Sequence, residues 1–169
     1  MANPIVCLDT HIFSFALGSS SPGEDSARLA KDFLRWIDKQ KLPIIVPTVV
    51  VSELLVAIPK EHHHSFLSKF SASWRVVEFD MLCAAQLAAI RRDEVIKKRL
   101  KQLMENGNPG ATKAALNVDA MIVATSIVHN VDTLYSYDKR LLALAKTCKV
   151  TAKRPEEEEF PLSMLSEDD

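Results

Sequence analysis

Short apolar segments alternate along the chain with longer segments whose apolar residues recur at helical spacing. A short apolar run bounded by turn residues is typical of a buried strand, and apolar residues three or four positions apart indicate a helix. We therefore expect strands at residues 4–8, 43–47, 74–79, 133–137 and 148–150. We expect helices at residues 27–40, 49–58, 61–70, 81–105, 118–130 and 139–147. Buried strands that alternate with helices predict an α/β fold, with three α/β/α layers around a central, mostly parallel sheet.

Polar and turn-forming residues mark the expected ends of these helices. Thr48 stands where a helix N-cap is expected, and Pro59 ends the helix that follows it. Asp80 is placed to cap the long helix 81–105, and the Gly- and Pro-containing loop 106–110 breaks that helix.

Composition and charge predict one folded domain and a tail. The 169 residues are 47% hydrophobic and 25% charged, which is ordinary for a globular protein. Residues 155–169 hold seven of the 22 acids and none of the 21 Lys and Arg residues, which leaves a net charge of +6 on residues 1–154. We expect a domain at 1–154 and an acidic, flexible tail at 155–169. A positive body is compatible with nucleic-acid binding, although such a tail is also explained by solubility alone.

Several classes of protein are disfavoured by what the sequence lacks. It has four glycines and neither a dinucleotide-binding nor a P-loop motif. Its three cysteines are scattered and form no C-x-x-C pair, which predicts reduced thiols and a cytoplasmic location. No secretory signal is evident, and no apolar run approaches the ~20 residues that cross a bilayer, so we expect no membrane association.

Four acidic residues lie in apolar surroundings, where an unpaired charge is costly. Asp9 ends the first predicted strand, and Asp138 directly follows the fourth. Glu53 interrupts an apolar helix, and Asp119 stands in the first turn of the predicted helix 118–130. Because ligand sites of parallel sheets lie at the carboxyl ends of the strands, we expect these acids at one edge.

Carboxylates that converge on one edge repel each other unless a cation lies between them. Oxygen ligands suit Mg²⁺ or Mn²⁺, and such a centre promotes hydrolysis of phosphodiester bonds. Each acid taken alone also has a simpler explanation, as a helix cap, as a favourable acid in a first helical turn, or as part of an exposed helix face. Their order and contexts together favour the metal site.

The order of these motifs resembles the PIN domain, a nuclease fold that includes the VapC-type toxins of bacterial and archaeal toxin–antitoxin pairs. The resemblance covers residues 4–150. The matching segments are Asp9-Thr10 after the opening strand, Ser52-Glu53, the helix 119-DAMIVATSIVHN-130, and 134-LYSYD-138.

The resemblance implies a metal-dependent endoribonuclease. Asp9, Glu53, Asp119 and Asp138 would be the catalytic acids that hold Mg²⁺ or Mn²⁺. Thr10 would support Asp9 through its hydroxyl or backbone, and Ser136 would lie beside the acids. The implied substrate is RNA, the implied partner is a small antitoxin protein, and the implied assembly is a homodimer.

Basic residues supply candidate RNA contacts. The segment 91-RRDEVIKKRLKQ-102 holds six bases and two acids, and nucleases need bases for the phosphate backbone. The candidates are Arg91, Arg92, Lys97, Lys98 and, next to the first acid, His11. The alternatives are a solvated helix face for the basic segment and a solvent-facing histidine at a helix start.

Other functions remain open on the sequence alone. A catalytically silent PIN-like module that binds nucleic acid or protein is the main alternative, although the presence of all four acids argues against it. A phosphatase of the haloacid dehalogenase type needs an acid two residues after Asp9, where His11 stands. The segment 91–117 is longer than in compact toxins of the family, which argues against the toxin role but not against the fold. Four further groups are expected outside the site: His62–His64 on a helix surface, Asp80 as a cap, Asp93 on the surface, and Asp132 in a turn.

Overall fold

A five-stranded sheet forms the centre of the protein, and its strands run in the order β3-β2-β1-β4-β5. This computed structural model describes residues 3–18, 24–105 and 112–158. All strand pairings among these residues are parallel, which confirms the predicted α/β class. The strands are β1 (Val6–Leu8), β2 (Ile44–Pro47), β3 (Arg75–Val77), β4 (Thr133–Tyr135) and β5 (Ala152–Lys153).

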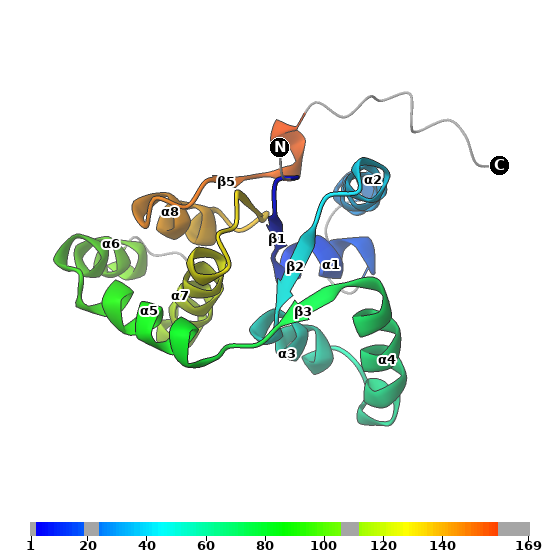
Figure 1. Cartoon of the computed structure of the whole chain (residues 1–169), viewed down its shortest axis with the longest axis horizontal. Helices are drawn as coiled ribbons and strands as arrows, with labels where there is room; N and C mark the ends of the chain where they lie inside the picture. Colours follow the sequence, from blue (N-terminus) through cyan, green and yellow to red (C-terminus); the bar gives the residue numbers. More distant parts are fainter. Residues whose placement is uncertain (1–2, 19–23, 106–111, 159–169) are drawn as a thin grey trace.

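Helices cover both faces of this sheet and give the three layers expected from the sequence. Figure 1 shows α5, α6, α7 and α8 grouped on one side of the strands, with α1, α2 and α4 on the other. The helices are α1 (Thr10–Ala16), α2 (Glu24–Gln40), α3 (Thr48–Val56), α4 (His63–Ser73), α5 (Met81–Arg92), α6 (Glu94–Glu105), α7 (Lys113–Val128) and α8 (Lys139–Thr147). Two short 3₁₀ helices, η1 (Lys60–His62) and η2 (Pro155–Glu157), complete the described elements.

The core lies where the central strands meet the apolar helices. All three residues of β1 are buried, as expected for a strand covered on both faces. Helix α7 is also apolar on most of its circumference, with Ile122 and Val123 almost inaccessible to solvent. The buried packing of β1 and α7 holds in place the backbone that positions Asp9, directly after β1, and Asp119, within α7.

Helix α1 was not among the helices expected from the sequence, although a helix start at His11 was one of the alternatives. It begins directly after Asp9, whose backbone has the extended conformation of an N-cap residue. The Asp9 side chain nevertheless makes no capping hydrogen bond to α1. Its carboxylate contacts the side chains of His11 and Ser136 instead of the backbone N–H groups of the first helical turn.

The long helix expected at 81–105 is two helices, and this prediction was wrong at Asp93. The Asp93 carboxylate accepts hydrogen bonds from the backbone N–H groups of Val95 and Ile96, at 2.8 and 3.0 Å. Asp93 is exposed, as expected, and it also caps α6. The predicted cap at Asp80 is confirmed, since its carboxylate accepts from the N–H of Cys83. The predicted break at 106–110 lies outside the described residues.

Several other boundaries differ from the prediction. Pro47, not Thr48, is the N-cap residue of α3, and Thr48 is the first helical residue. Helix α7 begins at Lys113 with Thr112 as its cap, so Asp119 lies in the second turn and not in the first. The last strand, expected at 148–150, is instead β5, at Ala152–Lys153.

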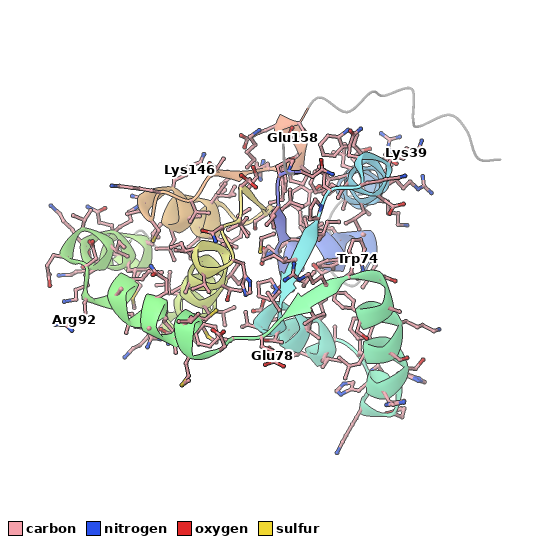
Figure 2. The ribbon with its side chains drawn as sticks, in the orientation of Figure 1. Lys39, Trp74, Glu78, Arg92, Lys146 and Glu158 are labelled. Carbon is pink, nitrogen blue, oxygen red and sulfur yellow. The ribbon has the colours of Figure 1, made fainter. Side chains whose placement is uncertain are left out.

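Two of the first four residues of the predicted tail, Pro155 and Glu158, pack against the domain. Pro155 is buried in η2, and the Glu158 carboxylate accepts hydrogen bonds from the Tyr135 hydroxyl and the Lys153 ammonium group, at 2.7 and 2.8 Å. Figure 2 shows Glu158 at the top of the molecule, beside η2. The described fold therefore extends to Glu158, and residues 159–169 lie outside the description.

Replacing Glu158 with Ala should lower the free energy of unfolding at pH 7 by about 1–2 kcal/mol, because the partly buried Tyr135 hydroxyl loses its acceptor. Burial alone would raise the pKa of Glu158, but the bonds from Lys153 and Tyr135 hold it below its usual value. A depressed carboxyl pKa stabilises the fold above the unfolded-state pKa, and this contribution is lost as the pH falls through the folded-state pKa.

Urea denaturation at pH 7 and pH 3 tests this prediction, with the exposed neighbour Glu156→Ala as the matched control. The Glu158 variant should lose stability at pH 7 and differ less from the wild type at pH 3. An equal loss at both pH values would show that the carboxylate charge contributes nothing.

Two further features bear on the sequence predictions. Cys7 and Cys83 are buried, Cys148 is partly buried, and all three are free thiols. None of the described helices is both long enough and apolar enough to cross a membrane.

Candidate functional site

Asp9 and Ser136 lie side by side at the carboxyl edge of the sheet. Leu8 and Tyr135 are paired in the parallel register of β1 and β4, so the residue that follows each strand reaches the same edge. The Ser136 hydroxyl donates a hydrogen bond of 2.6 Å to Oδ2 of Asp9. Asp9 is 3% exposed and Ser136 is fully buried. The predicted position of both residues follows directly from the parallel pairing.

Asp138 is connected to this pair through Ser136. Its backbone N–H donates to the Ser136 hydroxyl at 2.9 Å, and its Oδ1 accepts from the backbone N–H of Arg140 at 2.7 Å. Asp138 is therefore the N-cap of α8, which is the simpler of its two explanations. Its second oxygen, Oδ2, remains directed at the site and binds the Arg140 side chain at 2.9 Å.

Arg140 joins the carboxylates of Asp119 and Asp138. Its Nε donates to Oδ2 of Asp119 at 2.5 Å, and one terminal nitrogen contacts both acids. The Arg140 side chain is only 10% exposed. Sequence reasoning missed this residue, although a cation in the first turn of α8 opposes the helix dipole and was a usable signal.

Asp119 reaches the site from α7, and it is 4% exposed. Burial raises the pKa of this carboxyl to about 6. The hydrogen bonds and charge of Arg140 act in the opposite direction, and the charges of Asp138 and Asp9 raise the pKa further. Three carboxylates therefore lie close enough to influence each other, with Arg140 as their positive partner.

Glu53 approaches the cluster from α3 and is held by Thr10. The Thr10 hydroxyl donates to Oε2 of Glu53 at 2.5 Å. Thr10 thus supports Glu53 with its side chain, where the sequence suggested support of Asp9. Because Thr10 directly follows Asp9 in the chain, this bond brings Glu53 to the same edge of the sheet as the other acids.

His11 contacts the cluster, and its side chain is also 44% exposed at the start of α1. Its Nδ1 lies 3.1 Å from Oδ2 of Asp9, and its ring packs edge-on against Phe15. The hydrogen bond to Asp9 raises the pKa of His11, while burial opposes this effect. His11 thereby helps to hold the Asp9 oxygen that Ser136 also binds.

The other candidate RNA contacts lie on α5 and α6. Arg91 donates to the side-chain oxygen of Asn117, and Lys97 pairs with Glu94. Arg92 and Lys98 are exposed, and Figure 2 shows Arg92 on the outer side of α5. None of the interactions seen in the described residues joins these four bases to the acidic cluster.

The cluster has the donor chemistry of a hard divalent cation, with carboxylate oxygens and a serine hydroxyl. Within residues 3–18, 24–105 and 112–158, however, no three acidic, His or Cys side chains are arranged to hold an ion as they stand. Arg140 already contacts oxygens of Asp119 and Asp138. The residues therefore suit Mg²⁺ or Mn²⁺ chemically, and the Arg140 side chain must move for an ion to reach those oxygens.

Comparison with known proteins supports this reading of the fold. A model of the PIN domain family matches residues 6–147. Similar solved structures include VapBC2 from Rickettsia felis bound to a DNA fragment from its promoter, with a TM-score of 0.58, 18% identity, and coverage of 89% of this chain and 98% of that one. Another is a toxin–antitoxin complex from Klebsiella pneumoniae, with a TM-score of 0.56, 17% identity and coverage of 89% and 97%. At these identities the likeness to the two structures shows the fold. No curated protein matches the chain.

Proposed function

The chain belongs to the PIN domain family, and on this premise we propose that it is a metal-dependent endoribonuclease acting in the cytoplasm. The observation that carries the proposal is the acidic cluster at the carboxyl edge of the sheet. Asp9 and Asp119 are almost fully buried there, and Asp138 shares a cationic partner with Asp119. One guanidinium does not balance the charge of this group of acids, so a divalent cation would stabilise them once Arg140 moves aside.

Asp9, Glu53, Asp119 and Asp138 are the residues that would hold Mg²⁺ or Mn²⁺. When bound, such an ion supplies Lewis acidity, which polarises a phosphoryl oxygen and lowers the pKa of an attacking water.

The other residues of the site position these acids. Ser136 and His11 fix one oxygen of Asp9, and Thr10 fixes one oxygen of Glu53. These contacts restrict the rotation of both side chains, so that the site is organised before substrate arrives. Arg140 balances the charge of Asp119 and Asp138.

We also propose that the protein is the toxin of a toxin–antitoxin pair, acting as a homodimer that a small antitoxin protein inhibits. The support is that the two similar structures are described as toxin–antitoxin assemblies.

One observation favours a second function, a catalytically silent binding module. Arg140 contacts Asp119 and Asp138 closely, and an arginine that stayed there permanently would serve as a structural cation. The two functions differ in whether the protein cleaves RNA when a divalent ion is present.

Cleavage of a mixed RNA pool by the purified full chain distinguishes them. We expect fragments with Mg²⁺ or Mn²⁺ and none with EDTA, because the phosphodiester chemistry depends on a cation among the acids. Restoration of cleavage when excess Mn²⁺ is added to the EDTA sample is the control for irreversible damage. Intact RNA under all conditions, together with measurable Mn²⁺ binding, would favour the silent module. Cleavage that is undiminished in EDTA would contradict the metal-dependent mechanism.

A further inference from the structure

A basic groove of about 620 Å³ lies between α6 and α8. Figure 1 shows these two helices next to each other, and Figure 2 shows Lys146 on α8. The groove has a partly apolar floor that includes Leu142 and Ala143. Its four basic residues are Arg99, Lys139, Lys146 and Arg154, and no acid lines it.

The bases of the groove differ from other bases of α6 in their partners. Lys97 pairs with Glu94, and Lys101 pairs with Glu105, so each of these charges is balanced on its own helix. Within the part of the chain that the structure describes, no carboxylate pairs with any of the four bases of the groove. Their charge is therefore available to an anionic ligand.

Two of the four bases are placed where the fold itself gains little from them. Lys139 is the first residue of α8, where the helix dipole disfavours a positive charge. Arg154 directly follows β5, and its Nε is buried without a hydrogen-bond partner among the described residues. A buried donor without a partner is costly, so hydrogen bonding within the fold does not explain the position of the Arg154 side chain.

One end of the groove lies near the acidic cluster, although none of the acids lines the groove. Lys139 is adjacent in sequence to Asp138, and Arg154 leaves the carboxyl end of the parallel strand β5, which pairs with β4. The carboxyl ends of parallel strands share one edge of the sheet. The basic groove therefore begins at the edge where the acids lie.

We propose that this groove binds the sugar-phosphate backbone of single-stranded RNA and leads the strand to the acidic cluster. The bases meet the phosphates, and Leu142 and Ala143 pack against the sugars. Because no aromatic side chain lines the groove, affinity comes from phosphate contacts and depends little on base sequence. The role of the groove as a substrate path rests on the proposed nuclease function, while its ability to bind RNA is a separate claim.

Binding of a fluorescein-labelled single-stranded RNA by the full chain tests this claim. Fluorescence anisotropy in EDTA keeps the RNA intact, and titrations at several NaCl concentrations give the salt dependence. The double variant Lys139→Gln/Lys146→Gln should bind about 10-fold more weakly at 100 mM NaCl. The slope of log K against log salt should become shallower by about 1.4, since each phosphate contact to a single strand contributes ~0.7.

The matched control is Lys97→Gln/Lys101→Gln, which removes the same charge from paired bases of α6. Its affinity for RNA should stay within about twofold of the wild type, because neither lysine lines the groove. An equal loss of affinity in both double variants would contradict RNA binding in the groove and would show that affinity depends only on the total positive charge. Tighter binding of duplex than of single-stranded RNA, or no binding by the wild type, would also overturn it.

The cleavage assay separates this proposal from the nuclease proposal. Metal-dependent cleavage that the Lys139→Gln/Lys146→Gln variant performs with unchanged KM would overturn the groove and leave the nuclease in place. Groove-dependent RNA binding by a protein that never cleaves would leave the groove in place and contradict the nuclease.

Discussion

Replacing Asp9 with Asn is expected to lower RNA cleavage roughly 100-fold or more while the protein remains folded. The change keeps the size of the side chain but removes the charge at the buried oxygen that Ser136 and His11 hold. An amide is a weak ligand for Mg²⁺ or Mn²⁺ compared with a carboxylate. The loss should fall on kcat rather than on RNA affinity, because the basic groove does not include Asp9.

The matched control for this substitution is Asp93→Asn. Asp93 is an exposed cap of α6, and Asn caps helices about as well as Asp. Its cleavage rate and thermal unfolding temperature should match those of the wild type. Full activity of the Asp9 variant, at a metal concentration that saturates the wild type, would remove Asp9 from the catalytic acids.

Replacing Arg140 with Gln is expected to destabilise the metal-free protein by about 3 kcal/mol. The guanidinium group is 10% exposed and balances Asp119 and Asp138, and Gln leaves those carboxylates without a positive partner. Added Mn²⁺ should raise the unfolding temperature of this variant more than that of the wild type. The reason is that Arg140 and a bound ion use the same carboxylate oxygens, and a ligand that binds only the folded state stabilises it.

Arg35→Gln provides the matched control for Arg140→Gln. Arg35 also lies near a buried acid, Asp32, but its side chain is 64% exposed and the separation is 3.6 Å. Because the arginine of this pair is solvent-exposed, we expect its loss to cost about 1 kcal/mol, and Mn²⁺ should not distinguish this variant from the wild type. Equal stabilisation by Mn²⁺ of the wild type and the Arg140 variant would show that Arg140 and the ion do not compete.

The positions of Asp9 and Ser136 at the edge of the sheet could be predicted from the sequence, because residues that directly follow neighbouring parallel strands reach the same edge. Asp9 and Ser136 come directly after neighbouring strands, so their proximity follows once β1 and β4 pair in parallel. The contact of Arg140 with Asp119 could not be predicted in this way. Lys139 and Arg140 look equivalent in the sequence, and only the packing of α8 against α7 directs one of them to Asp119.

Helix boundaries were less predictable where a single capping residue stood within or beside a longer run of helix-forming residues. Asp93 stands inside a continuous run of helix-forming residues, and its capping of α6 depends on the direction of its side chain. Conversely, Thr112 and the Ala-rich start of α7 were readable as a cap and a helix start. Because the apolar run after Val118 was the stronger signal, the helix was predicted to start at residue 118 and not at Lys113. Asp119 was therefore assigned to the first turn of the helix, although it lies in the second.

Anomalous diffraction from crystals grown with MnCl₂ tests the central claim most directly, because it locates the ion without reference to activity. We predict an anomalous peak within coordination distance of carboxylate oxygens of Asp9 and Asp119, with the guanidinium of Arg140 turned away from Asp119. Arg140 still bound to Asp119 and Asp138, with no peak among the acids at millimolar Mn²⁺, would contradict a carboxylate metal centre in this protein.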